Sequence, residues 1–155
     1  VGRKYHHTMS SSLVYALREA LLMVEEEGLE ARVARHERDH LALAAGLEAM
    51  GLSLLPPPAE RLWTLNAVGV PAGVDEAAVR RTLLTTFNLE VGAGLGPLAG
   101  KIWRVGLMGA SSTPQTLLQF LAALESALAT SGHNVPAGAG VAAASAALRP
   151  ELTTA

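Results

Sequence analysis

The glycine-rich part of the sequence reads Gly92-Ala-Gly-Leu-Gly-Pro-Leu-Ala-Gly-Lys-Ile-Trp-Arg-Val-Gly-Leu-Met-Gly109, a loop that runs into a short apolar strand. Strand alternation places Arg104 on one face and its neighbours Trp103 and Val105 on the other. An arginine among apolar residues is costly to desolvate unless an anion meets it, and its planar fork fits a carboxylate. Arg104 is therefore a candidate carboxylate-binding residue. The alternative is an edge-strand arginine that reaches solvent or pairs with a nearby glutamate.

Hydrophobic periodicity on both sides of this stretch predicts helices and short strands. Helices are predicted from the serines at 10–12 to Gly28, over 29–50, after Asp75 and from Thr113 to Gly132. The Ala/Gly-rich end of the chain either holds one short helix around 141–148 or is mobile. Strands are predicted over 52–55, 62–70, 88–91 and 101–108. Long N-terminal helices followed by strands interleaved with helices predict an α/β (α+β) fold. In this fold a small, mainly antiparallel sheet is covered by helices.

The composition narrows the class of protein. The chain has 155 residues, of which half are hydrophobic, a net charge of −2 and no cysteine. A slightly acidic chain has no electrostatic basis for nucleic-acid binding, and no apolar run is long enough to span a bilayer. We therefore expect neither nucleic acid nor membrane as a partner. The absence of cysteine is compatible with a reducing compartment, and we expect a cytoplasmic protein.

A short motif on the second predicted helix resembles a zinc site. His36-Glu37-Arg38-Asp39-His40 matches the pattern H-E-x-x-H, in which two histidines on one helix face bind zinc and the glutamate acts as base. A catalytic site of this class also needs a third ligand and a substrate cleft. The alternative is that both imidazoles lie at a partly buried helix face with hydrogen-bond partners. We favour this alternative and expect no metal site.

A second segment changes the interpretation of Arg104. The chain begins with Lys4-Tyr5-His6-His7-Thr8, where two hydroxyls can both donate to one oxyanion group. Further motifs follow in order: Glu26 to Glu30, Arg35-His36, Val70-Pro-Ala-Gly73, Gly94-Leu-Gly-Pro97, Gly100-Lys101 and Arg104-Val-Gly-Leu107. This ordered series closely resembles the C-terminal part of the alanine–glyoxylate (serine–pyruvate) aminotransferases. These are pyridoxal-phosphate enzymes of fold type I, class V.

The resemblance implies a domain organisation and roles for particular residues. It implies that residues 1–12 end the large cofactor-binding domain, 13–132 form the C-terminal small domain, and 133–155 form an Ala/Gly-rich tail. Arg104 is then the ligand of the substrate carboxylate. Tyr5 and Thr8 bind the phosphate of the neighbouring subunit's pyridoxal 5'-phosphate across the interface of a homodimer.

The resemblance also implies a function for the longer protein. Such an enzyme moves an amino group between a small amino acid (alanine or serine) and a 2-oxo acid (glyoxylate or pyruvate). Lys4 and Lys101 are the only lysines, and neither matches the Schiff-base lysine of the family. We therefore expect a fragment that has no catalytic residue of its own and is inactive alone. The alternative function is a stand-alone, non-catalytic interaction domain with a helical Leu/Ala face.

Overall fold

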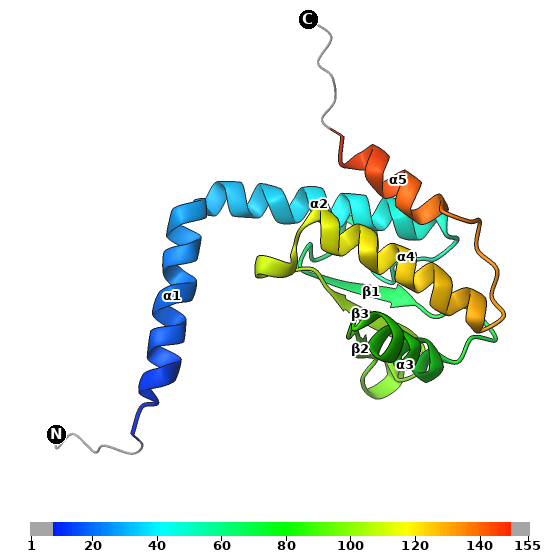
Figure 1. Cartoon of the computed structure of the whole chain (residues 1–155), viewed down its shortest axis with the longest axis horizontal. Helices are drawn as coiled ribbons and strands as arrows, with labels where there is room; N and C mark the ends of the chain where they lie inside the picture. The colour runs from blue at the N-terminus through cyan, green and yellow to red at the C-terminus, as the bar shows by residue number, and fades with distance from the viewer. Residues whose placement is uncertain (1–7, 150–155) are drawn as a thin grey trace, which may run out of the picture. The chain divides into compact units, whose positions relative to one another are not determined.

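The computed structural model describes residues 8–149. The chain divides into two compact units between Ala34 and Arg35. The helices are α1 (Ser11–Glu27), α2 (Leu29–Ala49), α3 (Glu76–Phe87), α4 (Pro114–Thr130) and α5 (Ala139–Ala147), and the strands are β1 (Leu65–Gly69), β2 (Gly92–Ala93) and β3 (Ile102–Gly106) (Figure 1). Short 3-10 turns lie at 58–60, 96–98 and 109–111. The predicted fold class, an α/β fold with a small antiparallel sheet and helices, is confirmed.

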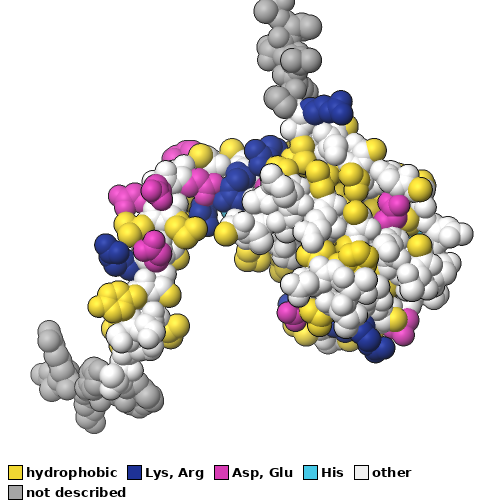
Figure 2. All heavy atoms as spheres, viewed as in Figure 1, with side chains coloured by type: hydrophobic (Ala, Val, Ile, Leu, Met, Phe, Trp, Pro, Cys, Tyr) yellow, Lys and Arg dark blue, Asp and Glu magenta, His cyan; other side chains and the backbone are white. Residues whose placement is uncertain are grey.

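The first unit is helical and keeps its apolar side chains exposed. Helix α1 ends at Gly28, whose φ of +84° suits glycine and whose N–H donates to the carbonyl oxygen of Val24 at 3.0 Å. None of its residues is buried. Figure 2 shows hydrophobic and charged side chains interspersed along this helix. The large exposed hydrophobic residues of α1 and of the segment just before it are Met9, Leu13, Val14, Tyr15, Leu17, Leu21, Leu22 and Met23.

The sheet of the second unit has three antiparallel strands in the order β1-β3-β2. The central strand, β3, pairs with β1 through Ala67 opposite Arg104, and with β2 through Gly92 opposite Arg104. Arg104 therefore occupies the middle of the sheet, with one neighbour on each side.

The core of the second unit lies between one face of the sheet and the helices. Val68 on β1 and Trp103 on β3 are opposite each other in the register and are almost completely buried. Helix α4 begins at the predicted Thr113, whose Oγ1 accepts the N–H of Thr116 at 3.2 Å, and Pro114 occupies the first turn. Helix α5 packs beside α4 (Figure 1), with Ala144 buried. The short helix, one of the two alternatives near 141–148, is thus present.

Several predicted boundaries were wrong. The strand predicted over 88–91 is absent, because Asn88 adopts φ +54° and caps the C-terminus of α3. The pairing strand lies farther along, at Gly92–Ala93. The strand predicted over 52–55 is reduced to a single bridge between Leu54 and Val68, and 62–70 is reduced to five residues. Helix α1 begins at the predicted serines, with Ser10 at the N-cap, although the Ser10 side chain makes no capping hydrogen bond.

Within residues 8–149, no helix has the length and apolar character needed to cross a membrane. The division into 1–12, 13–132 and 133–155 stays a prediction.

Candidate functional site

Arg104 lies at the centre of β3, on the sheet face opposite the core. Its cross-strand neighbours are the small residues Gly92 and Ala67. The side chain is partly buried, and its Nε donates to the carbonyl oxygen of Ala93 at 2.7 Å. The predicted alternation is confirmed, since the adjacent Trp103 is only 1 % exposed on the core side. A rigid strand therefore carries the guanidinium on the outer face of the sheet.

In the part of the chain that the structure describes, no carboxylate pairs with Arg104, and its Nη1 and Nη2 have no hydrogen-bond acceptor. Arg80, in contrast, is paired with a carboxylate. Its hydrogen bond to Glu76 raises the pKa of its guanidinium above the usual value. A partly buried guanidinium with two unused donor groups is suited to a carboxylate ligand. Ion pairs among the described residues include Arg32–Glu27, Arg38–Asp39, Arg61–Glu48 and Arg80–Glu76.

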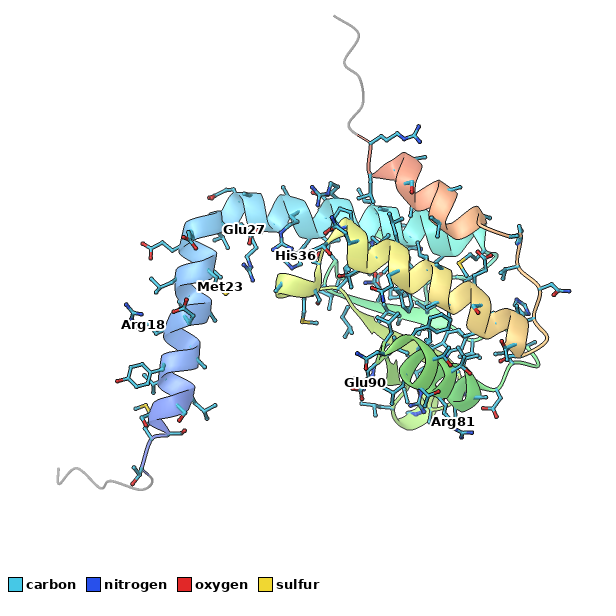
Figure 3. The ribbon with its side chains drawn as sticks, in the orientation of Figure 1. Arg18, Met23, Glu27, His36, Arg81 and Glu90 are labelled. Atoms are coloured by element: carbon cyan, nitrogen blue, oxygen red, sulfur yellow. The ribbon has the colours of Figure 1, made fainter. Side chains whose placement is uncertain are left out.

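An apolar cavity of about 190 Å³ lies on the other side of β3. Its lining includes Val105, Leu107 and Phe120, together with residues of the segment before β2 such as Glu90 (labelled in Figure 3). Val105, Leu107 and Phe120 are buried core residues, so this cavity lies toward the core at the C-terminal end of β3, and Arg104 is not among its lining residues. A cavity of this lining offers no positive charge, and so it is not the carboxylate site.

The two other residues with an assigned role are Tyr5 and Thr8. Tyr5 lies outside the described residues. Thr8 is exposed in the segment before α1. Their role as phosphate ligands stays a prediction.

Both histidines of the zinc-like motif are buried and have hydrogen-bond partners. His36 Nε2 accepts the backbone N–H of Gly109 at 3.0 Å, and His40 Nδ1 lies 2.7 Å from Asn66 Oδ1. Figure 3 shows His36 on α2 beside the loop that precedes α4. The described residues contain no group of three or more His, Cys, Asp or Glu side chains arranged to hold a metal. The two imidazoles thus have the environment of structural histidines.

We predict that the purified chain binds no zinc through this motif. Metal analysis should give much less than one zinc per chain, and added zinc should leave the thermal unfolding midpoint unchanged, because a true structural zinc stabilises the fold. His40→Ala should lower stability through the lost contact with Asn66, equally with and without zinc. Stoichiometric zinc that disappears in His40→Ala would overturn this prediction.

Sequence reasoning missed a polar cluster that fixes the loop after β3. Arg35 Nη1 donates to the carbonyl oxygens of Gly109 at 3.1 Å and Ser112 at 2.7 Å. Asp39, which is fully buried, accepts the hydroxyl of Ser112 at 2.9 Å. With His36 on Gly109, these contacts form an α2 clamp made of Arg35, His36 and Asp39. The clamp fixes the path of the chain from β3 into α4.

The chain was compared with known proteins by sequence and by structure. No family model matches the chain. It is 43 % identical over 142 residues to the (S)-ureidoglycine–glyoxylate transaminase of Bacillus subtilis, covering 92 % of this chain and 34 % of that protein. The crystal structure of the ureidoglycine–glyoxylate aminotransferase from B. subtilis superposes on 91 % of this chain and 36 % of its own, with a TM-score of 0.87 at 42 % identity. The chain belongs to the glyoxylate aminotransferase family of class V.

Other glyoxylate aminotransferases are similar over the same share of their length. The alanine–glyoxylate aminotransferase of Drosophila melanogaster is 39 % identical over 83 % of this chain and 33 % of that protein. The structure of an alanine–glyoxylate aminotransferase from Nostoc sp. is 50 % identical over 81 % of this chain and 33 % of its own, with a TM-score of 0.77. The chain spans about a third of the length of the curated relatives it matches. The family resemblance inferred from the motifs is confirmed.

Proposed function

We propose that this chain is the carboxylate-binding C-terminal part of a longer glyoxylate aminotransferase. That enzyme moves an amino group between a small amino acid, alanine or serine, and a 2-oxo acid, glyoxylate or pyruvate. The observation that carries the proposal is Arg104, a partly buried guanidinium whose Nη1 and Nη2 have no partner among the described residues. Family membership supports it. In this proposal residues 13–132 are the small domain, 1–12 belong to the large domain, and the enzyme is a cytoplasmic homodimer.

The contacts of Arg104 define how a carboxylate meets it. Nε already donates to the carbonyl oxygen of Ala93. The two remaining edges of the fork are Nη1 and Nη2, so the carboxylate binds end-on to this pair in bidentate fashion. Because both the amino acid and the 2-oxo acid carry the same carboxylate, one arginine holds either substrate. Fixing this group orients the reacting carbon and lowers the entropic part of the barrier.

Class V aminotransferases use pyridoxal phosphate, which supplies an electron sink when bound. Lys101 is the one lysine among the described residues, and it is exposed in the turn before β3. The 190 Å³ cavity is lined by neither lysine nor arginine. We therefore assign the cofactor and its lysine to the remaining part of the longer protein.

We predict that the 155-residue chain alone retains no pyridoxal phosphate. After mixing and gel filtration, the protein fraction should show no visible absorbance from the cofactor, and Lys101→Ala should behave identically. A stoichiometric absorbance band that travels with the protein and is lost in Lys101→Ala would contradict this prediction. It would place the cofactor lysine in this chain.

The function itself is tested on the longer protein that contains this chain. With pyridoxal phosphate present, that protein should convert glyoxylate to glycine with alanine or serine as amino donor. Absence of transfer from any small amino acid, in a protein shown to be folded and loaded with cofactor, would rule out the proposed function.

We predict that Tyr5→Phe and Thr8→Ala in the longer protein each weaken cofactor retention by about 1.5–3 kcal/mol, the usual cost of a lost hydrogen bond to a charged group. The dissociation constant of the cofactor, measured by fluorescence, reports this change. Because the contact crosses the dimer interface, a heterodimer with an inactive partner should show the defect in the partner subunit's site. A defect confined to the mutated subunit's own site would refute the assignment across the interface.

A further inference from the structure

The hydrogen bonds between β2 and β3 determine which way the carbonyl of Ala93 points. The N–H of Gly94 donates to the carbonyl oxygen of Ile102 at 3.1 Å, so these two residues form a hydrogen-bonded pair. In an antiparallel ladder such pairs alternate with non-hydrogen-bonded pairs. The next pair, Ala93 and Trp103, is therefore of the second kind. Because β2 is the outer strand, the carbonyl of Ala93 points away from β3, toward the open edge of the sheet.

The side chain of Arg104 nevertheless reaches this carbonyl. Its Nε lies 2.7 Å from the oxygen of Ala93, so the side chain crosses the face of β2 to the edge. The residue beneath the crossing is Gly92, the register partner of Arg104. A Cβ at residue 92 would lie 3.2 Å from Nη2, 3.3 Å from Nε and 3.4 Å from Cβ of Arg104. These three atoms are the nearest that such a Cβ would meet. A side chain at residue 92 would therefore push the side chain of Arg104 out of its place.

We propose that Gly92 is a positioning residue for Arg104. Its lack of a side chain lets the guanidinium lie against the backbone of β2 and dock Nε on the Ala93 carbonyl. Docking holds Nη1 and Nη2 at the β2 edge of the sheet, and this sets the place and direction at which a carboxylate binds. This role rests on the proposed function only for the identity of the ligand, since the docking of Nε is a property of the chain itself.

The test compares Gly92→Ala with Gly106→Ala in the 155-residue chain. Gly106 lies on the same sheet face two residues beyond Arg104, and a Cβ there meets only Met108 Cε, at an ordinary 3.7 Å. The Nε–H signal of Arg104 is assigned by NMR through its disappearance in Arg104→Lys. We expect its exchange with water to be about tenfold faster in Gly92→Ala than in the parent chain or Gly106→Ala, as for loss of one hydrogen bond. Unchanged exchange in Gly92→Ala would overturn the proposal.

Pyruvate, titrated against the same signals, tests the consequence for binding. We expect its dissociation constant to rise about tenfold in Gly92→Ala and to change little in Gly106→Ala. Weaker binding with Nε–H still protected would overturn the proposal, because Gly92 would then act on the ligand directly. If the parent chain binds no pyruvate while Nε–H responds as expected, Arg104 does not bind a carboxylate in this chain by itself, and the docking role of Gly92 stands.

A double variant keeps the test valid if Gly92→Ala unfolds. In Gly92→Ala/Arg104→Ala the two guanidinium atoms that the new Cβ would meet at 3.2 and 3.3 Å are gone, and only the Cβ of residue 104 at 3.4 Å remains. Recovery of the parent unfolding midpoint in the double variant would support an effect that acts through the arginine. Continued unfolding would show that residue 92 must be glycine for the backbone alone, which overturns the proposal.

Discussion

Replacing Arg104 by lysine in the longer aminotransferase is expected to lower kcat/KM at least about 30-fold. Lysine keeps the positive charge but loses the planar fork, so it cannot bind the carboxylate through two parallel hydrogen bonds. Truncating one partner of a desolvated charge pair usually costs about 2–5 kcal/mol, which corresponds to a loss of this size. The loss should appear with the amino acid and with the 2-oxo acid, because both present the same group.

Steady-state kinetics of both half-reactions measure this effect, and cofactor absorbance should stay unchanged. Arg81→Lys is the matched control, because Arg81 is exposed on α3 (Figure 3) and should tolerate the same exchange. Unaltered kcat/KM in Arg104→Lys, or loss of cofactor in place of substrate affinity, would show that Arg104 is structural and that the carboxylate binds elsewhere.

Trp103→Ala should destabilise the chain by about 3–5 kcal/mol, the usual cost of removing a large aromatic side chain from a core. Trp103 is 1 % exposed, and its Nε1–H donates to the carbonyl oxygen of Glu76 at 3.2 Å, which ties β3 to the start of α3. Such a loss is a large fraction of the total stability of a domain, about 5–15 kcal/mol. Urea unfolding followed by far-ultraviolet circular dichroism measures it.

Two variants separate packing from the hydrogen bond at this position. Trp103→Phe keeps much of the buried volume but leaves the Glu76 carbonyl without its donor, so it should cost about 1–3 kcal/mol. Trp63→Ala removes the other tryptophan, which is 36 % exposed, and should cost well under half of Trp103→Ala. Equal losses in Trp63→Ala and Trp103→Ala would contradict the central place of Trp103 in the core.

Much of the fold was predictable because its signals are local. Helices α4 and α3 begin at Thr113 and Asp75, whose side chains accept hydrogen bonds from backbone N–H groups two or three residues later. Such capping residues can be recognised from the sequence alone. The strand over 88–91 was mispredicted because its apolar residues suit a strand, whereas Asn88 adopts the left-handed conformation at the end of α3. Asparagine tolerates that conformation better than most residues, and the position of a helix end is the least certain feature of a sequence.

The candidate site was predictable only in part. Strand alternation identified Arg104 and the face on which it lies. Nothing in the sequence shows that Nε docks on Ala93, since this contact depends on the register between two strands. Asp39 likewise lies in a run of charged residues typical of an exposed helix face. In the fold it is completely buried and accepts a hydrogen bond from Ser112, which is distant in sequence.

The α2 clamp bears on how this chain folds during synthesis. Asp39 and Ser112 are 73 residues apart, so the carboxylate receives this partner only after Ser112 has been translated. At about 5–20 residues per second, the ribosome needs roughly 4–15 s to cover that distance. During this interval Oδ1 can pair with the neighbouring Arg38, but Oδ2 still lacks the Ser112 hydroxyl and stays hydrated, because burying a carboxylate oxygen without a partner is costly. The closure of α2 over the loop after β3 is therefore a late step in co-translational folding.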